Sequence, residues 1–349
     1  MTQPEAPLIS VVIITRNEAT HIAAAIEAVL PEVARYPGAE ILVVDSASTD
    51  RTVDIARRYP VGVVRLSARW PLSAAAGRYI GDRLTSGQFI LHLDGDMVLT
   101  PGWLETALPL MQANPHLAGV SGYWVNLTVE NGRVVHRETL EQVDRPTPVK
   151  ELGGAALYRR QALVEVGGFQ PFIRSYEEPE LCARLRHAGY TLLRLPGQIC
   201  DHYGLPEHSA ASYRRRWRSK LWIGCGQMLR YHLGKETFRE VATLQGSIYF
   251  LSNLLGFAAF LGLSLLGLVS RKKPPLLVAG AGAGAAIGAL YYKKRSLAAV
   301  ALNLWLRGLI VLSGLEGFFT PPLPPDQYPT DVEIIQPIPA IKADHASQI

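Results

Sequence analysis

The first hundred residues alternate short β-branched runs with amphipathic segments, and this alternation limits the fold more than any other feature of the sequence. Segments with helical spacing (16–30, 48–60 and 71–85) separate the runs. Parallel strands joined by right-handed helical crossovers satisfy this order, so we expect a doubly wound, mostly parallel α/β sheet. The four runs that we expect to be buried strands are PLISVVIIT (7–15), EILVVD (40–45), VGVVRL (61–66) and QFILHLD (88–94).

Polar and acidic residues follow three of these strands. Thr15 ends the first strand with Glu18 just beyond it, Asp45 ends the second, and Asp94 and Asp96 end the fourth. A single Asp after a strand is more often a turn or cap residue than a ligand. The carboxyl ends of parallel strands meet at one edge, however, and ligands of such sheets bind there. Several acids at that edge therefore favour a ligand site.

Two features of the sequence indicate the type of ligand at this edge: the absence of glycine-rich phosphate-binding motifs and the presence of a pair of aspartates. Neither GxGxxG after the first strand nor GxxxxGK[ST] occurs, so a dinucleotide site or a P-loop is disfavoured. Asp94 and Asp96 flank Gly95, which allows the tight turn that two carboxylates need to reach one ion. Hard cations such as Mg²⁺ or Mn²⁺ bind carboxylates and keep positions for substrate phosphates. We therefore expect a divalent metal at this turn.

Seven motifs in a fixed order resemble those of the family 2 glycosyltransferases, which have the GT-A fold. They cover about residues 8–205 and read SVVIITRNE, ILVVDSASTDRT, AAAGRYIGDRL, FILHLDGDM, ELGGAALYRRQAL, VGGF and YEEPELCARLRHAGY. The ordered set is far more specific than a lone DxD. The resemblance implies an inverting, metal-dependent hexosyltransferase that moves one sugar from a UDP-, GDP- or dTDP-sugar to an acceptor hydroxyl.

The resemblance also assigns roles to individual residues. Asp94 and Asp96 form the DxD motif, with Asp96 on the metal and Asp94 on ribose or metal, and His202 matches a third metal ligand. A structural histidine is at least as common, so His202 is weak evidence alone. Ser48 and Asp50 are expected to shape a loop and cap a helix rather than touch ligand. The expected donor-binding residues are Thr15, Glu18, Asp45, Arg78, Asp94 and Arg216.

The catalytic base is where the sequence departs from the family. Inverting transfer needs a carboxylate that takes the acceptor proton, and the family supplies an Asp after a Glu, before a helix. Here Glu178 occupies the place of that Asp, after Glu177. Either glutamate is a candidate base. A non-catalytic interpretation also exists, because Pro179 and acidic residues suit the first turn of a helix.

Three residues are candidates for the acceptor side. Gly153 and Gly154 mark a loop where the backbone approaches the sugar or the acceptor. The segment SYRRRWRSK (212–220) resembles the QxxRW motif of processive synthases only in part, with Trp217 in place but Tyr213 where Gln or Arg is usual. Processive synthesis is therefore disfavoured. The arginines of this segment are candidates for donor pyrophosphate or lipid phosphate, or for holding the domain at anionic headgroups.

The chain changes character near residue 245. Three hydrophobic segments follow (247–270, 276–292 and 297–319), and the first is long enough to span a bilayer without a charge. The third carries Arg307 and Glu316 and is the least secure as a lipid-exposed helix. Soluble-core helices are the alternative. Three crossings would place the RKK cluster outside, against the positive-inside rule, whereas two crossings or a re-entrant pair would not.

These observations give an expected domain organisation and location. We expect a cytosolic GT-A domain over 1–240 that includes a basic juxtamembrane segment (212–240). A membrane domain with two or three helices (245–320) and an extended or disordered proline-rich tail (321–349) follow. The N-terminus has no signal peptide, and three widely spaced cysteines suit a reducing compartment. We expect a multi-pass protein of the cell membrane with a cytoplasmic catalytic domain, where the sequon at Asn126 is fortuitous.

The partners expected from these features are a nucleotide-sugar donor, a lipid-linked or glycan acceptor, and the membrane. The net charge of +5 and the placement of the basic clusters do not suggest nucleic acid. Two alternatives to single-sugar transfer stay open at this point. One is a processive polysaccharide synthase, and the other is a non-catalytic membrane-anchored scaffold that keeps the fold.

Overall fold

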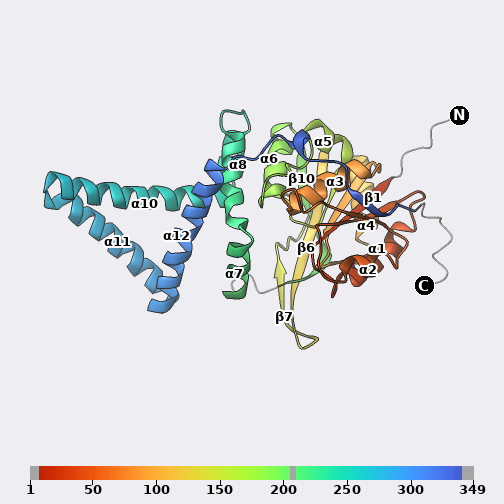
Figure 1. Cartoon of the computed structure of the whole chain (residues 1–349), viewed down its shortest axis with the longest axis horizontal. Helices are drawn as coiled ribbons and strands as arrows, with labels where there is room; N and C mark the ends of the chain where they lie inside the picture. Colours follow the sequence, from red (N-terminus) through yellow and green to blue (C-terminus); the bar gives the residue numbers. More distant parts are fainter. Residues whose placement is uncertain (1–7, 205–209, 340–349) are drawn as a thin grey trace. The chain divides into compact units, whose positions relative to one another are not determined.

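A computed structural model describes residues 8–204 and 210–339 of the 349-residue chain (Figure 1). The chain forms two compact units. The first, which we call the sheet unit, contains residues up to Ser219 together with the segment from Pro322 onward. The second, which we call the helical unit, is Lys220–Pro321.

The sheet unit is built on a mixed sheet of eleven strands, in the order β11-β3-β2-β1-β4-β9-β6-β10-β5, with β7 beside β6 and β8 beside β10. The strands β3, β2, β1 and β4 are parallel, as expected, and β6 and β10 are also parallel to each other. The other pairs are antiparallel. The expected α/β fold is therefore confirmed, although its second half is mixed rather than parallel. The bounds are β1 Ile9–Thr15, β2 Glu40–Asp45, β3 Gly62–Arg65, β4 Phe89–Asp94, β5 Met97–Leu99, β6 Leu117–Glu130, β7 Arg133–Leu140, β8 Thr147–Pro148, β9 Ala156–Arg159, β10 Thr191–Tyr203 and β11 Glu333–Gln336.

Helices cover both faces of this sheet and create two apolar layers. One layer joins β1, β2 and β4 to helices that include α1 and α4, through side chains such as Ile26 and Leu108. The other layer joins the same strands to α3, α5 and α6, through side chains such as Ile80 and Leu181. Burial on both faces explains why the first strands are uninterrupted apolar runs. The bounds are α1 Ile22–Val33, α2 Thr52–Ala56, α3 Ala74–Leu84, α4 Trp103–Ala113, α5 Arg160–Glu165, α6 Glu177–His187 and α7 Ala210–Arg218.

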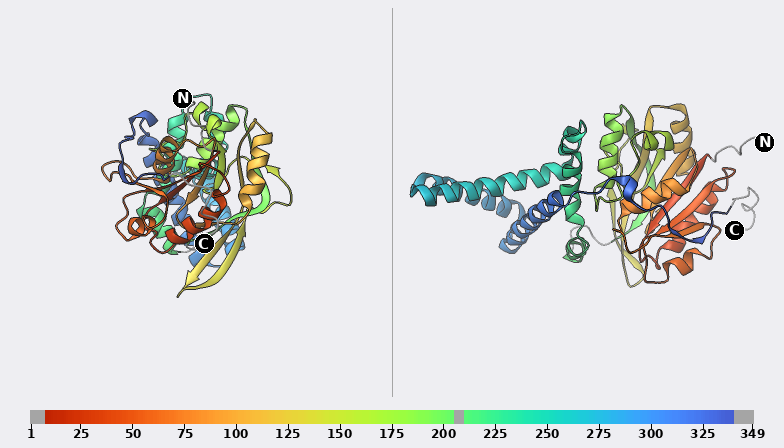
Figure 2. Two further views of the ribbon diagram at one scale, coloured as in Figure 1. Left: turned by 90° about the vertical axis from the view of Figure 1, so that its right-hand side faces the viewer. Right: turned by 45° about the horizontal axis from the view of Figure 1, so that its top comes forward.

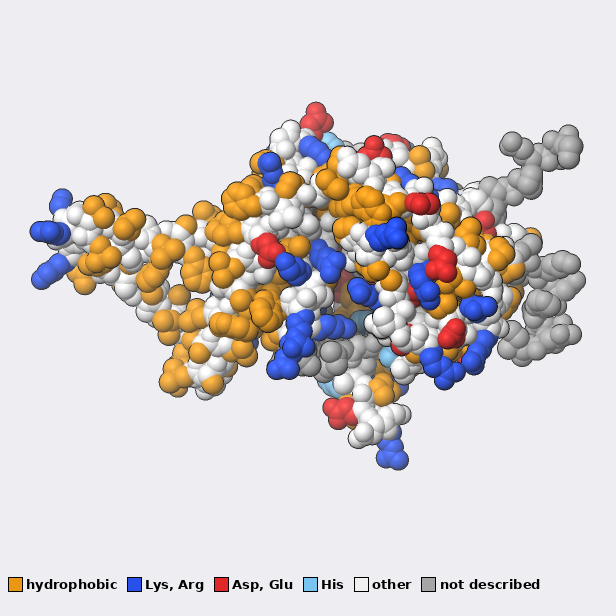
Figure 3. Space-filling view, viewed as in Figure 1, with side chains coloured by type: hydrophobic (Ala, Val, Ile, Leu, Met, Phe, Trp, Pro, Cys, Tyr) orange, Lys and Arg blue, Asp and Glu red, His pale blue; other side chains and the backbone are white. Residues whose placement is uncertain are grey.

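The helical unit contains three helices that are long and apolar enough to cross a membrane. Apolar side chains cover the surface of these helices (Figure 3). Arg307 of the third helix donates to Asn253 and Asn303, at 2.8 Å each, and Glu316 accepts from Lys220 at 2.7 Å. Both charged side chains of this helix therefore have polar partners. The bounds are η1 Leu221–Ile223, α8 Gly224–His232, α9 Phe238–Ala242, α10 Gln245–Ser270, α11 Lys273–Lys294 and α12 Leu297–Phe319.

The C-terminal segment corrects the expected domain boundaries. Residues 322–339 belong to the sheet unit instead of forming a separate tail, and the helical unit starts at Lys220 rather than near 245. The segment runs back over the sheet unit (Figure 2), where η2 (Pro325–Gln327) precedes β11, which pairs antiparallel with β3. The strand has only four residues, and its partner β3 lies far away in the sequence, so local composition did not reveal it. Residues 340–349 of the expected tail lie outside the described residues.

Tyr328 anchors this segment to the sheet unit. Its side chain is 3% exposed, its hydroxyl donates to the carbonyl of Pro71 at 3.1 Å, and its ring contacts Trp70, Tyr79 and Phe172. Burial of the phenol raises the pKa of Tyr328 to about 12. The segment is thus held by an aromatic cluster as well as by backbone pairing.

Truncation of this anchor tests the packing of the segment. We expect Tyr328→Ala to lower the free energy of unfolding by about 3 kcal/mol, because a buried ring leaves a cavity. Tyr328→Phe is the matched control, since it keeps the ring and loses one hydrogen bond, worth about 1 kcal/mol. Thermal unfolding of the purified full chain in detergent measures both. An equal melting temperature for wild type and Tyr328→Ala would contradict the described packing.

Candidate active site

The predicted site residues of the first strands meet at one edge of the sheet. Thr15 pairs with Asp45 in the register of β1 and β2, and Ile14 pairs with Asp94 in the register of β1 and β4. Gly95 donates its backbone N–H to the carbonyl of Ile14 at 2.8 Å, which starts the turn between the two acids. The sequence prediction that these side chains share one edge is therefore confirmed.

Arg78 joins this edge to the first turn of α6. Its guanidinium is 1% exposed and lies 2.8 Å from Asp94 Oδ1, 2.7 Å from Glu177 Oε1 and 3.0 Å from Glu178 Oε1. Its side chain also lies over the ring of Phe169. We call Arg78 and its three carboxylates the Arg78 cluster.

This geometry departs from the expected role of Arg78. The sequence placed Arg78 near the donor phosphates, but both terminal nitrogens of its guanidinium already contact carboxylates of the chain. The reason is burial, because α3 packs its inner face on the sheet and carries Arg78 with it. In this structure Arg78 orients the acids and does not face solvent.

Burial and charge within the Arg78 cluster shift the pKa values of Arg78, Glu177 and Asp94. Burial would lower the pKa of Arg78, but the charges of Glu178, Asp94 and Glu177 raise it above its ordinary value. Burial, followed by the charge of Glu178, raises the pKa of Glu177 to about 8 against the opposing effect of Arg78. Burial, together with the charges of Asp96 and Glu178, also raises the pKa of Asp94. The fold therefore favours the protonated form of Glu177.

Gly154 closes the Arg78 cluster from the side of the preceding loop. A Cβ at this position would lie 3.0 Å from Asp94 Oδ2 and 3.2 Å from Arg78 Nη2. Gly153, beside it, faces the ring of Trp124, which a Cβ would approach at 3.4 Å. The backbone at these two glycines approaches the acids and Trp124 closely, whereas the expected approach to a sugar or an acceptor stays a prediction.

Asp96 faces a different partner from Asp94. Its Oδ2 lies 3.4 Å from His202 Nε2, and the backbone N–H of Tyr203 donates to its carbonyl at 2.8 Å. The other ring nitrogen of His202 lies 2.7 Å from Asn126 Oδ1. Burial lowers the pKa of His202, but Asp96 outweighs this effect and raises it. The side chain of the predicted sequon thus orients an imidazole inside the fold.

The expected three-ligand metal set is not assembled in this arrangement. Within residues 8–204 and 210–339, no three His, Cys, Asp or Glu side chains lie close enough together to hold an ion. The cause is Arg78, which engages Asp94. Asp96 and His202 still supply one carboxylate oxygen and one imidazole nitrogen, and Mg²⁺ or Mn²⁺ often takes one or two protein ligands together with substrate phosphates. Asp96 and His202 therefore fit a site in which an ion has two protein ligands and substrate phosphates complete its coordination.

The other end of the edge presents unpaired polar atoms. Thr15 Oγ1 and Asp45 Oδ1 are buried without a hydrogen-bond partner among the described residues. Buried polar groups normally have partners, so unpaired ones indicate a ligand position. The remaining oxygen of Asp45 accepts from the backbone N–H of Ser48 at 3.0 Å and from Arg65 at 3.3 Å. Arg65 also lies 3.7 Å from Glu333 of β11.

Glu18, Ser48 and Asp50 lie in the loops beside these atoms. Glu18 Oε2 is 3.0 Å from His21, whose ring stacks on Tyr203, and burial raises the pKa of Glu18, with a smaller contribution from Asp96. The hydroxyl of Ser48 accepts from the backbone N–H of Asn17. Asp50 accepts from the backbone N–H groups of Ala19 and Thr52. The expected loop-shaping role of Ser48 and Asp50 agrees with these bonds.

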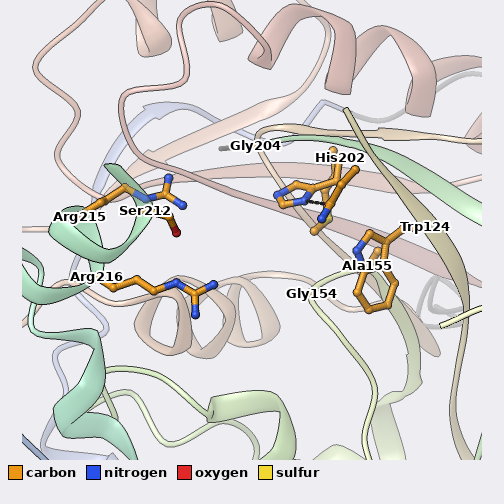
Figure 4. A pocket seen from close by; sticks show the side chains of 10 residues that line it. Trp124, Gly154, Ala155, His202, Gly204, Ser212, Arg215 and Arg216 are labelled. Carbon is orange, nitrogen blue, oxygen red and sulfur yellow. Dashed lines mark hydrogen bonds between the residues drawn. The ribbon is translucent and has the colours of Figure 1, made fainter. Parts of the chain in front are cut away.

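A cavity of about 150 Å³ lies beside these groups. Arg215, Arg216 and Ser212 of α7 line one side, and His202, Trp124 and Gly154 line the opposite side (Figure 4). Arg216 was predicted here, whereas Trp217 does not line the cavity and is 54% exposed. Arg215 belongs to the segment whose arginines were candidates for phosphate binding. The residues of the lining that the sequence did not suggest are Met97, Trp124, Asn126, Ala155, Gly204 and Ser212.

Comparison with known proteins agrees with this geometry. A family model described as glycosyl transferase family 2 matches residues 10–178, which contain the edge acids, Arg78 and the two glutamates. The chain belongs to the family 2 glycosyltransferases. This glycosyltransferase is 26% identical to glycosyltransferase AglE of Haloferax volcanii over 250 residues, which are 68% of the chain and 79% of AglE.

Two solved structures share the fold of this glycosyltransferase. The mannosyltransferase PcManGT of Pyrobaculum calidifontis, in complex with GDP-Man and Mn²⁺, aligns with a TM-score of 0.59 at 18% identity, over 91% of this chain and 88% of PcManGT. S. aureus TarS in complex with UDP-GlcNAc aligns with a TM-score of 0.50 at 16% identity, over 89% of this chain and 90% of that TarS chain. The GT-A fold is thereby confirmed.

The raised pKa of Glu177 predicts a pH dependence of stability. Between its ordinary value of 4.5 and about 8, the folded glycosyltransferase binds a proton that the unfolded chain releases. The stability from Glu177 is therefore fully present below about pH 4.5 and is lost as the pH rises through about 8. Glu177→Gln should reduce the fall in melting temperature over this window.

Thermal unfolding in detergent at a series of pH values measures this effect. Glu138→Gln, on the exposed strand β7, is the control and should keep the wild-type pH profile. If Glu177→Gln also kept that profile, the proposed protonation of Glu177 would be wrong.

Proposed function

We propose that this glycosyltransferase transfers a single hexose, with inversion, from a nucleotide diphosphate sugar to a hydroxyl of a membrane-presented acceptor. The observation that carries the proposal is the Arg78 cluster, which holds Asp94 and Glu178 together beside a cavity that also contains His202. One carboxylate belongs to the donor motif and the other to the position of the base. A scaffold without catalysis has no need for this costly buried arrangement.

The nucleoside binds at the unpaired end of the sheet edge. Thr15 Oγ1 and Asp45 Oδ1 lack partners and are placed to accept or share hydrogen bonds with base and ribose, with Glu18 close by. PcManGT and TarS were solved with GDP-Man and UDP-GlcNAc, which supports a donor of this chemical class. Arg215 and Arg216 face the cavity from α7 and suit the donor diphosphate.

Asp96 and His202 hold a divalent ion, Mg²⁺ or Mn²⁺, and Asp94 lies close enough to interact with the charge of this site. When bound, the ion neutralises charge on the leaving diphosphate. Asn126 holds the His202 ring through one nitrogen, which leaves the other directed at Asp96. The presence of Mn²⁺ in the PcManGT complex supports this assignment.

Glu178 is the catalytic base. Its side chain is 17% exposed, whereas that of Glu177 is 7% exposed and has a raised pKa, so the fold favours its protonated form. The acceptor oxygen attacks the anomeric carbon, the bond to the diphosphate breaks, and the acceptor proton passes to Glu178. Arg78 positions Glu178 through its contact with Oε1 at 3.0 Å.

Conservative substitutions of the acids test the catalytic proposal. We expect Glu178→Gln to lower kcat by at least about 100-fold with little change in donor KM, because it removes proton acceptance alone. Asp96→Asn should weaken the dependence on Mn²⁺ and lower turnover comparably. The measurement is nucleotide release from a panel of UDP-, GDP- and dTDP-sugars with Mg²⁺ or Mn²⁺, using the full chain in nanodiscs.

Asp144→Asn, on a loop outside the site, is the matched control for that experiment and should keep wild-type turnover. Wild-type rates in both Glu178→Gln and Asp96→Asn would instead favour a non-catalytic scaffold. If Glu177→Gln lost nucleotide release while Glu178→Gln kept it, Glu177 would be the base instead of Glu178.

We also propose that the sheet unit lies at the cytosolic face and that the chain crosses the membrane an even number of times. Residues before the helical unit and residues 322–339 after it fold into one sheet unit, and a folded unit lies on one side of a bilayer. The chain must therefore leave and return on the same side. Two of the three long helices then cross, or a pair is re-entrant, as the two basic clusters favour.

Protease protection of terminal epitope tags tests this topology. Tags at the two ends of the chain should be digested together in vesicles of one orientation and protected together in the other. A cytosolic loop of a known marker protein in the same vesicles is the orientation control. Opposite behaviour of the two tags would mean an odd number of crossings and would exclude the pairing of β11 with β3 in the membrane-inserted protein.

A further inference from the structure

The cavity contains an aromatic ring that the sequence motifs did not identify. Trp124 of β6 lines it, whereas Trp217, the tryptophan of the partial RRW motif, does not. The indole of Trp217 is 54% exposed. The aromatic wall of the site is therefore provided by a strand of the sheet and not by the basic helix α7.

The surroundings of Trp124 fix its ring. Gly153 leaves only van der Waals space beside the indole, since a Cβ there would lie 3.4 Å from it. The guanidinium of Arg194 lies 6.0 Å from the ring centroid and itself pairs with Glu141. The backbone of Trp124 is paired with both Leu140 and Cys200 on the flanking strands. A ring held on a central strand is a rigid surface.

Several polar side chains line the cavity, together with Met97 and Ala155. Ser212, Arg215 and Arg216 face Trp124 from α7, and His202 lies beside it (Figure 4). Asn126 also lines the cavity and contacts His202 at 2.7 Å. Trp124 thus offers a flat apolar surface beside several hydrogen-bonding groups, which suits a ligand with both an apolar and a polar face. A pyranose has the matching chemistry, because its axial C–H groups form an apolar face that packs on the electron-rich face of an indole. Its hydroxyls remain at the rim for the polar groups.

We propose that Trp124 is the platform on which a pyranose ring stacks during transfer, in place of Trp217. This inference rests on the proposed function and adds a specificity residue to it. The loop Glu151–Gly154 links this platform to the base, since Arg194 donates to the carbonyl of Glu151 at 3.4 Å and Gly154 contacts the Arg78 cluster. The stacked ring belongs to the donor or to the acceptor, which share this chemistry.

Kinetics of two Trp124 variants test the proposal in full-length protein in nanodiscs. Trp124→Leu removes the π surface and should raise the KM for the stacked sugar about tenfold, with affinity for the free nucleoside diphosphate unchanged. Trp124→Phe keeps a ring and should stay within about threefold of wild type. Donor hydrolysis without acceptor gives the donor KM, and transfer to methyl pyranosides gives the acceptor KM.

A comparison of the donor KM with the acceptor KM identifies which sugar stacks on Trp124. A rise in donor KM alone assigns the donor sugar, and a rise in acceptor KM alone assigns the acceptor sugar; either supports the platform. If neither the donor KM nor the acceptor KM changes in Trp124→Leu, the proposal is overturned. It is also overturned if this variant loses affinity for the nucleoside diphosphate to the same extent as for the sugar, because such a loss indicates a general structural defect. Trp217→Leu is measured in parallel, and a loss confined to that variant would return the role to Trp217.

A spectroscopic measurement covers the case in which Trp124→Leu does not fold. Titration of methyl pyranosides into the wild type with bound nucleoside diphosphate should change tryptophan emission, and Trp124→Phe should lose that change while keeping its KM. Persistence of the change in Trp124→Phe overturns the proposal. Absence of nucleotide release from every donor in the wild type would instead contradict the proposed function itself, so the two failures are distinguishable.

Discussion

The ion pairs of Arg78 are the interaction on which the rest of the site depends. The guanidinium joins Asp94, which ends a central strand, to Glu177 and Glu178, which begin α6. Glu177 lies 99 residues after Arg78 in the chain. Three carboxylates at one cation leave an excess of negative charge, and burial makes that excess costly. The raised pKa of Glu177 is the consequence, because one protonated acid brings the cluster closer to neutrality. The cluster thereby favours the protonated form of Glu177.

The ion pair with Arg78 gives the two aspartates of the DxD motif different surroundings. Asp94 contacts the guanidinium inside the fold, and Asp96, across the turn at Gly95, lies beside His202. Gly154 is required next to this pair, since a side chain would meet Asp94 and Arg78 at about 3 Å. The turn therefore has an inward acid that fixes the position of the loop and a second acid that remains close to the cavity.

The parts of the fold that followed from the sequence are those with local signals. The parallel half has uninterrupted apolar strands, and its edge acids were placed by topology alone. The antiparallel strands β9, β5 and β11 are short and were not expected, because their pairing depends on partners far along the chain. Contacts between distant residues are equally hidden for side chains, as Arg78, Asn126 and Trp124 show. Their partners Glu177, His202 and Gly153 are distant in sequence, so no spacing rule connects them.

The strand β11 ties the end of the chain to the end of the sheet edge that holds Thr15 and Asp45. Arg65 of β3 lies between Asp45 and Glu333, and Gln336 donates to the carbonyls of Tyr59 and Val61 just before β3 begins. Glu333 is 64% exposed, so its ion pair adds little energy by itself. The backbone pairing and the packing of Ile338 against Gly62 fix the strand instead. Arg65 is thus held on an edge that is complete only when the chain has returned from the helical unit.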